Sequence, residues 1–90
     1  MILAISGSLK TTSSNSTIIR EMASFASDAR FEIYGELERL PPFNPDKEAG
    51  NEAVQRFKQI LKEAQGVIIS TPEYAFGVPG ALKNALDWTV

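Results

Sequence analysis

Cysteine and histidine are both absent from this 90-residue chain. Without cysteine there is neither a disulfide framework nor a thiolate metal site, and without histidine the commonest general base and metal ligand is missing. A basic excess is lacking too, because the formal net charge is −2, which argues against a nucleic-acid surface. We therefore predict no metal site and no nucleic-acid partner.

Long apolar runs are also missing, since no stretch approaches the roughly 20 residues that a membrane-spanning helix needs. The opening residues MILAISGSLK have no basic n-region and no long apolar segment, so they do not fit the pattern of a signal peptide. The remaining composition is that of an ordinary globular chain, 43% hydrophobic and 22% charged. We expect a cytoplasmic protein without a membrane segment, and residues 1–90 as a single domain.

Apolar patterning predicts strands that alternate with helices. Three stretches have the pattern of strands, the second of them near a sheet edge: 2–5, 31–34 and 67–70. Three have the pattern of helices: about 15–27, about 51–65, and from about Pro79 onward. The proline-rich residues 37–50 are predicted to be a loop. This β-α-β-α-β-α order indicates an α/β fold with a parallel sheet and helices on its faces.

A hydroxyl-rich loop, SGSLKTTSSNS, connects the first predicted strand to the first predicted helix. Free N–H groups and the helix dipole attract anions at such a helix N-terminus. The loop brings seven hydroxyls, one amide and one ammonium: Ser6, Ser8, Thr11, Thr12, Ser13, Ser14, Ser16, Asn15 and Lys10. It contains neither G-x-G-x-x-G nor G-x-x-x-x-G-K-[ST], which favours the terminal phosphate of a mononucleotide over a dinucleotide or a triphosphate. The alternative is a polar turn whose serines only cap the helix.

The loop after the third predicted strand, TPEYAFGVP, carries rigid and aromatic side chains. In doubly wound sheets the first and third strands are neighbours, so this loop and the hydroxyl-rich loop would share one crevice. Pro72, Tyr74 and Phe76 offer an apolar wall for a flat ring. A ring wall beside a phosphate cradle describes flavin mononucleotide, FMN. Two alternatives stay open: the aromatics contact a subunit partner, and Glu73 is a solvated or interface carboxylate.

Three segments together resemble the NAD(P)H-dependent FMN reductase family, which includes quinone, azo and chromate reductases. Gly7 to Lys10, followed by Ser13 and Asn15, is similar to the family signature G-S-L-[RK]-x-x-S-x-N. TPEYAFGVPGALKNALDW resembles the second signature, and LPPFNPD resembles the proline loop between the two. The segments follow the family order and cover essentially the whole chain, so the joint match is specific.

The resemblance implies a flavodoxin-like fold, bound FMN, and hydride transfer from NAD(P)H through the flavin to a small acceptor such as a quinone or azo dye. It implies a dimer or tetramer, and it assigns no catalytic side chain because the flavin carries the chemistry. By this resemblance one set of residues holds the phosphate and ribityl end: Ser8, Lys10, Ser13, Ser14 and Asn15. A second set lines the ring: Pro72, Glu73, Tyr74 and Phe76. Position 75, often Asn in the family, is Ala here.

The length departs from the family pattern, because the flavodoxin-like order is 2-1-3-4-5 and only three strands are predicted. We therefore expect a fold truncated to its first three β-α units, with an open apolar edge on the third strand. An FMN-dependent oxidoreductase is the first hypothesis. The second is an inactive fragment or assembly module that uses this edge together with Tyr74, Phe76 and Trp88. Trp88 is alternatively a packing residue, and a third hypothesis is a binding protein for another phosphorylated nucleotide.

Overall fold

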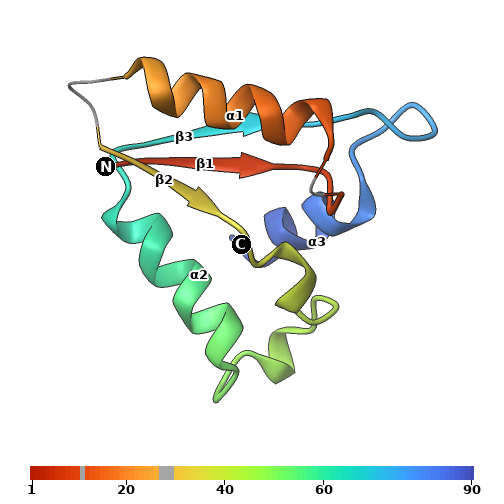
Figure 1. Cartoon of the computed structure of the whole chain (residues 1–90). Helices are drawn as coiled ribbons and strands as arrows, with labels where there is room; N and C mark the ends of the chain where they lie inside the picture. Colours follow the sequence, from red (N-terminus) through yellow and green to blue (C-terminus); the bar gives the residue numbers. More distant parts are fainter. Residues whose placement is uncertain (11, 27–29) are drawn as a thin grey trace.

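The computed structural model describes residues 1–10, 12–26 and 30–90. Thr11 of the hydroxyl-rich loop and the predicted helix end at Ser27 lie outside the described residues. Three parallel strands form one sheet in the order β2-β1-β3 (Figure 1), and their bounds are β1 Ile2–Ser6, β2 Phe31–Tyr34 and β3 Gly66–Ser70. This confirms the predicted α/β sheet, with the first strand in the centre and the second at an edge.

Three α-helices accompany the strands: α1 Ser14–Phe25, α2 Glu52–Glu63 and α3 Gly80–Asp87. Figure 1 shows α1 on one face of the sheet and α2 on the other, so the arrangement has three layers. No helix in the described ranges is long and apolar enough to cross a membrane. The prediction of an unstructured loop over 37–50 is wrong in detail, because two short 3-10 helices lie there, η1 Leu37–Arg39 and η2 Pro45–Lys47. The Asn44 side chain caps η2 by accepting a hydrogen bond from the Asp46 N–H at 3.0 Å.

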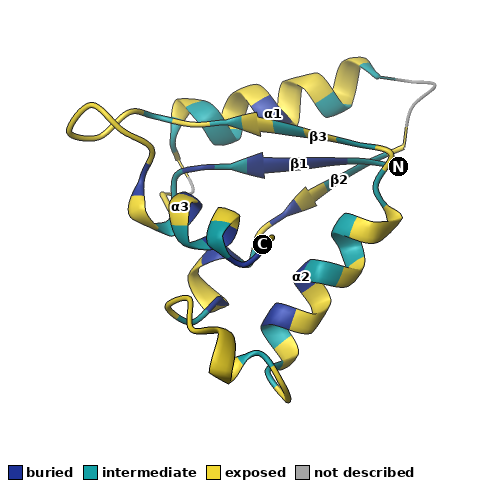
Figure 2. Cartoon of the chain, turned by 180° about the vertical axis from the view of Figure 1, so that it is seen from behind, coloured by how far each residue is buried: buried dark blue, intermediate teal, exposed yellow. Residues whose placement is uncertain are grey.

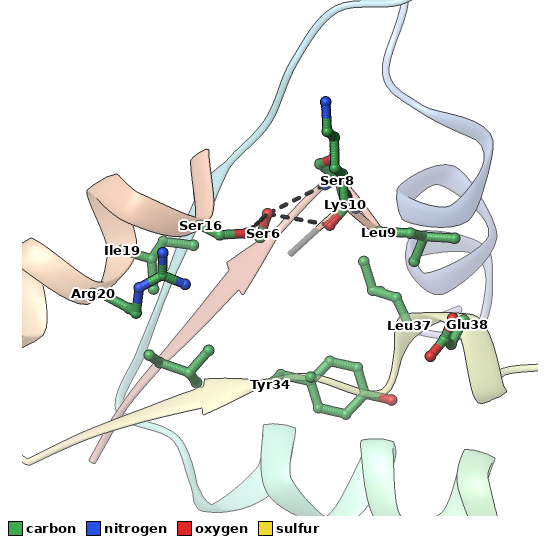
Figure 3. A pocket seen from close by; sticks show the side chains of 12 residues that line it. Ser6, Ser8, Leu9, Lys10, Ser16, Ile19, Arg20, Tyr34, Leu37 and Glu38 are labelled. Carbon is green, nitrogen blue, oxygen red and sulfur yellow. Dashed lines mark hydrogen bonds between the residues drawn. The ribbon is translucent and has the colours of Figure 1, made fainter. Parts of the chain in front are cut away.

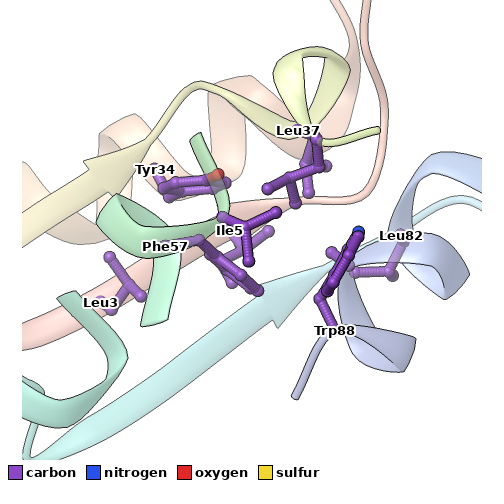
Figure 4. Packing of buried hydrophobic residues seen from close by; sticks show 10 residues of the cluster. Leu3, Ile5, Tyr34, Leu37, Phe57, Leu82 and Trp88 are labelled. Carbon is purple, nitrogen blue, oxygen red and sulfur yellow. The ribbon is translucent and has the colours of Figure 1, made fainter. Parts of the chain in front are cut away.

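The main core lies between the sheet and the helices α2 and α3 (Figure 4). Leu3 and Ile5 of β1 contribute one side of it, and Phe57, Leu82 and Trp88 of the two helices contribute the other. The aromatic ring of Phe57 lies 4.9 Å from that of Tyr34, measured between centroids. The sequence predicts an apolar stripe along the helix at 51–65, and it is confirmed because its members are buried or packed against this cluster: Val54, Phe57, Ile60, Leu61 and Ala64.

Helix α1 packs on the opposite face of the sheet, and most of its residues are exposed or half-buried (Figure 2). Ile19 is its one buried residue among those described. Ile18, Met22 and Phe25, which share its predicted apolar stripe, are 49%, 39% and 81% exposed. The helix was predicted correctly, and it lies over β1 and β3 with only one of its described residues buried.

The proline loop is fastened to α3 by two side chains. The Asn84 amide donates to the Pro41 carbonyl at 2.9 Å and accepts from the Phe43 N–H at 2.8 Å. The Trp88 indole donates to the same Pro41 carbonyl at 2.8 Å and is only 1% exposed. The packing interpretation of Trp88 is therefore confirmed, and the alternative in which Trp88 forms part of an assembly surface is wrong. Asp87, near the end of α3, accepts a hydrogen bond from Lys83 one helical turn away at 2.5 Å.

Candidate functional site

The first turn of α1 is held in place by a chain of serine hydroxyls. Ser13 is the N-cap, and its Oγ accepts from the Ser16 N–H at 3.1 Å, as predicted for a capping serine. The Ser16 hydroxyl lies 3.0 Å from that of Ser13 and donates to the Ser6 hydroxyl at 3.3 Å. The helix N-terminus is thereby tied to the end of β1. Ser14, the first residue of α1, is exposed.

The loop between β1 and α1 folds back on its own hydroxyls. The Ser8 N–H donates to Ser6 Oγ at 3.3 Å, and the Lys10 N–H donates to Ser8 Oγ at 3.2 Å. The side chain of Lys10 is exposed, and it forms no ion pair with any of the residues that the structure describes. No acidic residue occurs between Met1 and Arg20, so no carboxylate of this segment opposes an anion at the helix N-terminus.

The ends of β1 and β3 meet closely, as the sheet order requires. The Gly7 N–H donates to the Ser70 carbonyl at 2.8 Å. A Cβ atom at Gly7 would lie 2.3 Å from Thr71 Oγ1, so only glycine fits this approach without displacement of its neighbour. The Ser70 hydroxyl donates to Asn15 Oδ1 at 2.7 Å. The start of α1, the end of β1 and the start of the third loop therefore form one connected unit.

The third loop ends in a tight hairpin with a strained backbone. Tyr74 and Gly77 exchange two backbone hydrogen bonds, at 2.8 and 3.0 Å. The two residues between them, Ala75 and Phe76, have φ of 49° and 64°, a region that favours glycine or asparagine. The hairpin projects the Phe76 side chain into solvent at 98% exposure and leaves Tyr74 56% exposed.

The other two residues predicted to line a ring stand at the base of this hairpin. Pro72 is half-buried and Glu73 is exposed. Glu73 forms no ion pair within the described ranges. The Glu73 side chain is thus exposed to solvent, and none of the hydrogen bonds among the described residues gives it a partner.

A cavity of about 380 Å3 opens between the ends of β1 and β2 and the first turns of α1 (Figure 3). Ser8 and Lys10 line it, whereas no residue of the third loop does. Ser6 and Ser16 of the hydroxyl-rich loop also line the cavity, and so does Arg20, which was not predicted as a site residue. Ser16 and Arg20 are four residues apart on α1, and residues with this spacing lie on the same face of a helix. This spacing is the sequence signal that would have predicted Arg20 as a neighbour of the hydroxyl-rich loop.

Tyr34 forms the far wall of this cavity, at the end of β2. Its hydroxyl is buried and has no hydrogen-bond partner among the described residues. Burial, together with the nearby Glu36 carboxylate, raises the pKa of Tyr34 from 10.0 to about 12, and Arg56 opposes this rise. The phenol is therefore neutral at physiological pH and serves as packing rather than as a base.

The arrangement as a whole suits an anion with a flat group attached. The hydroxyl-lined end of β1 supplies donors at a helix N-terminus, with one free ammonium nearby. One strand away, the third loop supplies exposed aromatic surface. The structure thus joins the phosphate-binding set through Asn15 and Ser70 to the base of the ring-lining set, while the cavity that Ser8 and Lys10 line opens between β1 and β2 and includes no residue of the third loop.

Comparison with known proteins identifies relatives along the whole chain. The sequence model of the family described as NADPH-dependent FMN reductase matches residues 1–90. An NADH-dependent flavin reductase subunit 2 from Lactobacillus johnsonii is 39% identical, over 98% of this chain and 47% of that protein. A 2-hydroxy-1,4-benzoquinone reductase from a Burkholderia species is 40% identical, over 97% of this chain and 48% of that protein.

A solved structure agrees with these sequence matches. The flavoenzyme FerB from Paracoccus denitrificans, described as an NAD(P)H:(acceptor) oxidoreductase, superposes with a TM-score of 0.87 at 30% sequence identity. The superposition covers 97% of this chain and 48% of FerB. The chain therefore spans about half the length of the relatives it matches, and the flavodoxin-like fold expected from the signatures is confirmed.

Proposed function

The chain belongs to the NADPH-dependent FMN reductase family, and on that basis we propose that residues 1–90 form the FMN-binding unit of an NAD(P)H-dependent oxidoreductase. The observation that carries the proposal is the junction of the two strand ends. There the N-terminus of α1, the β1 loop and the base of the third loop are joined by the hydrogen bonds of Gly7 and Asn15 to Ser70. A phosphate and a ring bound to the two loops would belong to one molecule.

The residues present fit the phosphate end of FMN. The α1 N-terminus offers backbone N–H groups that have no partner within the helix. Ser13, Ser8 and the amide of Asn15 add short polar side chains, and Lys10 adds a positive charge that no described carboxylate neutralises. This donor set matches a compact dianion. Ser14 lies at the same turn and completes the proposed set.

The third loop would hold the ring. Pro72 gives rigid apolar surface at the base of the hairpin, and the exposed aromatics Tyr74 and Phe76 lie beyond it. Glu73 contributes its backbone N–H rather than an acidic proton. When bound, FMN supplies the redox chemistry, a hydride transfer between NAD(P)H and an acceptor. The side chains of this chain bind and orient the cofactor, and none is assigned a proton-transfer role.

The acceptor we propose is a small molecule such as a quinone or a flavin, because the relatives are named for these substrates. We further propose a cytoplasmic homo-oligomer. Support for self-association comes from the exposed aromatic side chains of the hairpin, which are available to a second copy. The net charge of −2 supports the absence of a nucleic-acid partner.

A second candidate function is assembly without flavin. The observation in its favour is the apolar exposure of β3, where Val67 and Ile69 are 44% and 42% exposed, together with the exposed Phe76 of the loop that follows this strand. Sedimentation analysis with and without FMN separates the two candidates. A stable oligomer whose size is the same with and without FMN would favour the assembly function. An oligomer that forms only when FMN is present would favour the oxidoreductase function.

The main test is direct. We expect protein mixed with FMN to stay yellow after desalting and to oxidise NADPH. Lys10→Ala should weaken FMN binding about tenfold and Ser13→Ala about fivefold, as expected for one charged and one neutral hydrogen bond. Lys62→Ala, which removes an exposed lysine at the end of α2, is the matched control and should bind FMN normally. Unchanged FMN affinity in both loop variants, or equal competition by AMP, would refute the assignment.

A further inference from the structure

Ser70 has a place in the fold that no signature singled out. It is the last residue of β3, immediately before the third loop. Its carbonyl accepts from the Gly7 N–H at 2.8 Å, and its hydroxyl donates to Asn15 Oδ1 at 2.7 Å. Ser70 is therefore held on the β1 side by its backbone and contacts α1 with its side chain, across 55 positions of sequence.

The Ser70 hydroxyl acts as the donor in this bond, and this sets the direction of the Asn15 side chain in the structure. A primary amide has an accepting oxygen on one side and two N–H donors on the other. Because the oxygen of Asn15 faces the Ser70 hydroxyl, the NH2 group faces away from β3. Asn15 is the second residue of α1, where its own backbone N–H also has no partner within the helix. The side-chain NH2 group and the backbone N–H of Asn15 are thus both available to an anion at the helix N-terminus.

We propose that Ser70 is a positioning residue for phosphate binding, which rests on the FMN-binding function proposed above. It holds the Asn15 amide with the NH2 group turned toward the phosphate. In the opposite orientation the amide oxygen would face an anion and repel it. A hydroxyl at position 70 satisfies the oxygen in the productive orientation, and a methyl group there leaves it without a donor.

A role of the Ser70–Asn15 hydrogen bond in supporting the fold can be distinguished from its role in orienting the Asn15 amide. The contact between the two strand ends is also made by the Gly7 N–H to the Ser70 carbonyl, which a change of side chain leaves in place. The N-cap bond of Ser13 independently fixes the start of α1. Loss of the Ser70 hydroxyl should therefore affect the orientation of one amide more than the packing of the fold.

The test compares Ser70→Thr with Ser70→Val, two side chains of the same shape that differ by a hydroxyl. We expect the threonine variant to bind FMN like the wild type and the valine variant to bind it about fivefold more weakly, the effect of one hydrogen bond. Riboflavin, which lacks the phosphate, should bind equally to both variants. In an Asn15→Ala background the two variants should have the same FMN affinity. Flavin fluorescence quenching gives all of these dissociation constants.

Two results would overturn the proposal. One is equal FMN affinity of the threonine and valine variants. The other is an equal loss of affinity for FMN and for riboflavin in the valine variant, which would mean that the hydroxyl only supports the fold.

Failure of the proposed function has a different signature, namely a wild-type protein that binds neither flavin. In that case the side-chain amide signals of Asn15 are followed by NMR during titration with inorganic phosphate. A phosphate-induced shift in Ser70→Thr that is missing in Ser70→Val would support the positioning role. An equal response in both variants, or no response in either, would overturn it.

Discussion

Substitution of Gly7 by alanine tests the junction on which the site depends. The added Cβ would lie 2.3 Å from Thr71 Oγ1, 2.6 Å from Thr71 Cβ and 3.1 Å from Leu82 Cδ2. The first two contacts are far shorter than any that real side chains make. Thr71 cannot easily turn away, because its Oγ1 donates to the Pro72 carbonyl at 2.8 Å and its Cβ is attached directly to the backbone.

The magnitude follows from this geometry. An extra methyl group in a tightly packed region costs about 1–3 kcal/mol, and contact with a nearly fixed Cβ places Gly7→Ala toward the upper end. A loss of about 2.5 kcal/mol lowers the melting temperature of a domain of this size by roughly 15 °C. Since the strain is relieved by separation of the β1 and β3 ends, FMN affinity should also fall.

Urea unfolding followed by tryptophan fluorescence measures the effect, because the single tryptophan is buried in the core. Gly80→Ala is the matched control, since a Cβ there meets no atom within 4 Å and alanine favours the start of α3. We expect Gly7→Ala/Thr71→Gly to recover part of the loss in Gly7→Ala, judged against Thr71→Gly alone. If Gly7→Ala unfolds at the same urea concentration as the wild type, the strand ends do not meet as described.

Three further predictions concern the hairpin, the proline loop and the buried phenol. Ala75→Asn should raise the free energy of unfolding by about 0.5–1 kcal/mol, because asparagine tolerates the φ of 49° that strains alanine; a more stable Ala75→Val would contradict this. Asn84→Ala should lower it by about 2 kcal/mol through the loss of two loop hydrogen bonds, and an unchanged urea midpoint would show that they are dispensable. Burial, and after it the Glu36 carboxylate, raises the pKa of Tyr34 in the folded state from 10.0 to about 12. Because the unfolded chain loses this proton at a lower pH than the folded protein, the free energy of unfolding should fall as the pH rises from 10.0 toward 12. Tyr34→Phe should show a shallower alkaline fall with unchanged stability at pH 7, and identical alkaline curves would refute the assignment.

The order of the elements and the two loops was predictable because it depends on local patterns. A continuous apolar run, a hydroxyl cap and a proline before a helix each have their effect within a few residues. Alternation of strands and helices predicts a parallel sheet, and the order β2-β1-β3 is the one that the resemblance to the flavodoxin-like pattern implies.

What the patterns missed depends on contacts between distant residues. Asn84 occupies a helix in a polar position that looks solvated, yet it binds a loop more than 40 residues earlier. Ser70 looks like the end of an apolar strand, and its role appears only when α1 is packed beside it. Ile18, Met22 and Phe25 recur at helical spacing on α1 and are nevertheless exposed, because periodicity fixes which face is apolar and not how much of it another element covers.

The two halves of the proposed site differ in how much order they already have, and this difference sets where binding energy should come from. The phosphate half is partly buried and held by hydrogen bonds of Ser13, Asn15 and Ser70, so little conformational entropy is lost when an anion binds there. The ring half projects Tyr74 and Phe76 into solvent at 56% and 98% exposure, so ordering them offsets part of the stacking energy. Affinity for flavins should therefore depend chiefly on the phosphate.

Riboflavin is expected to bind at least tenfold more weakly than FMN, which corresponds to about 1.4 kcal/mol. Equal affinities would place the binding energy on the hairpin instead, and would require the exposed aromatics to be ordered by a contact that lies outside the described residues.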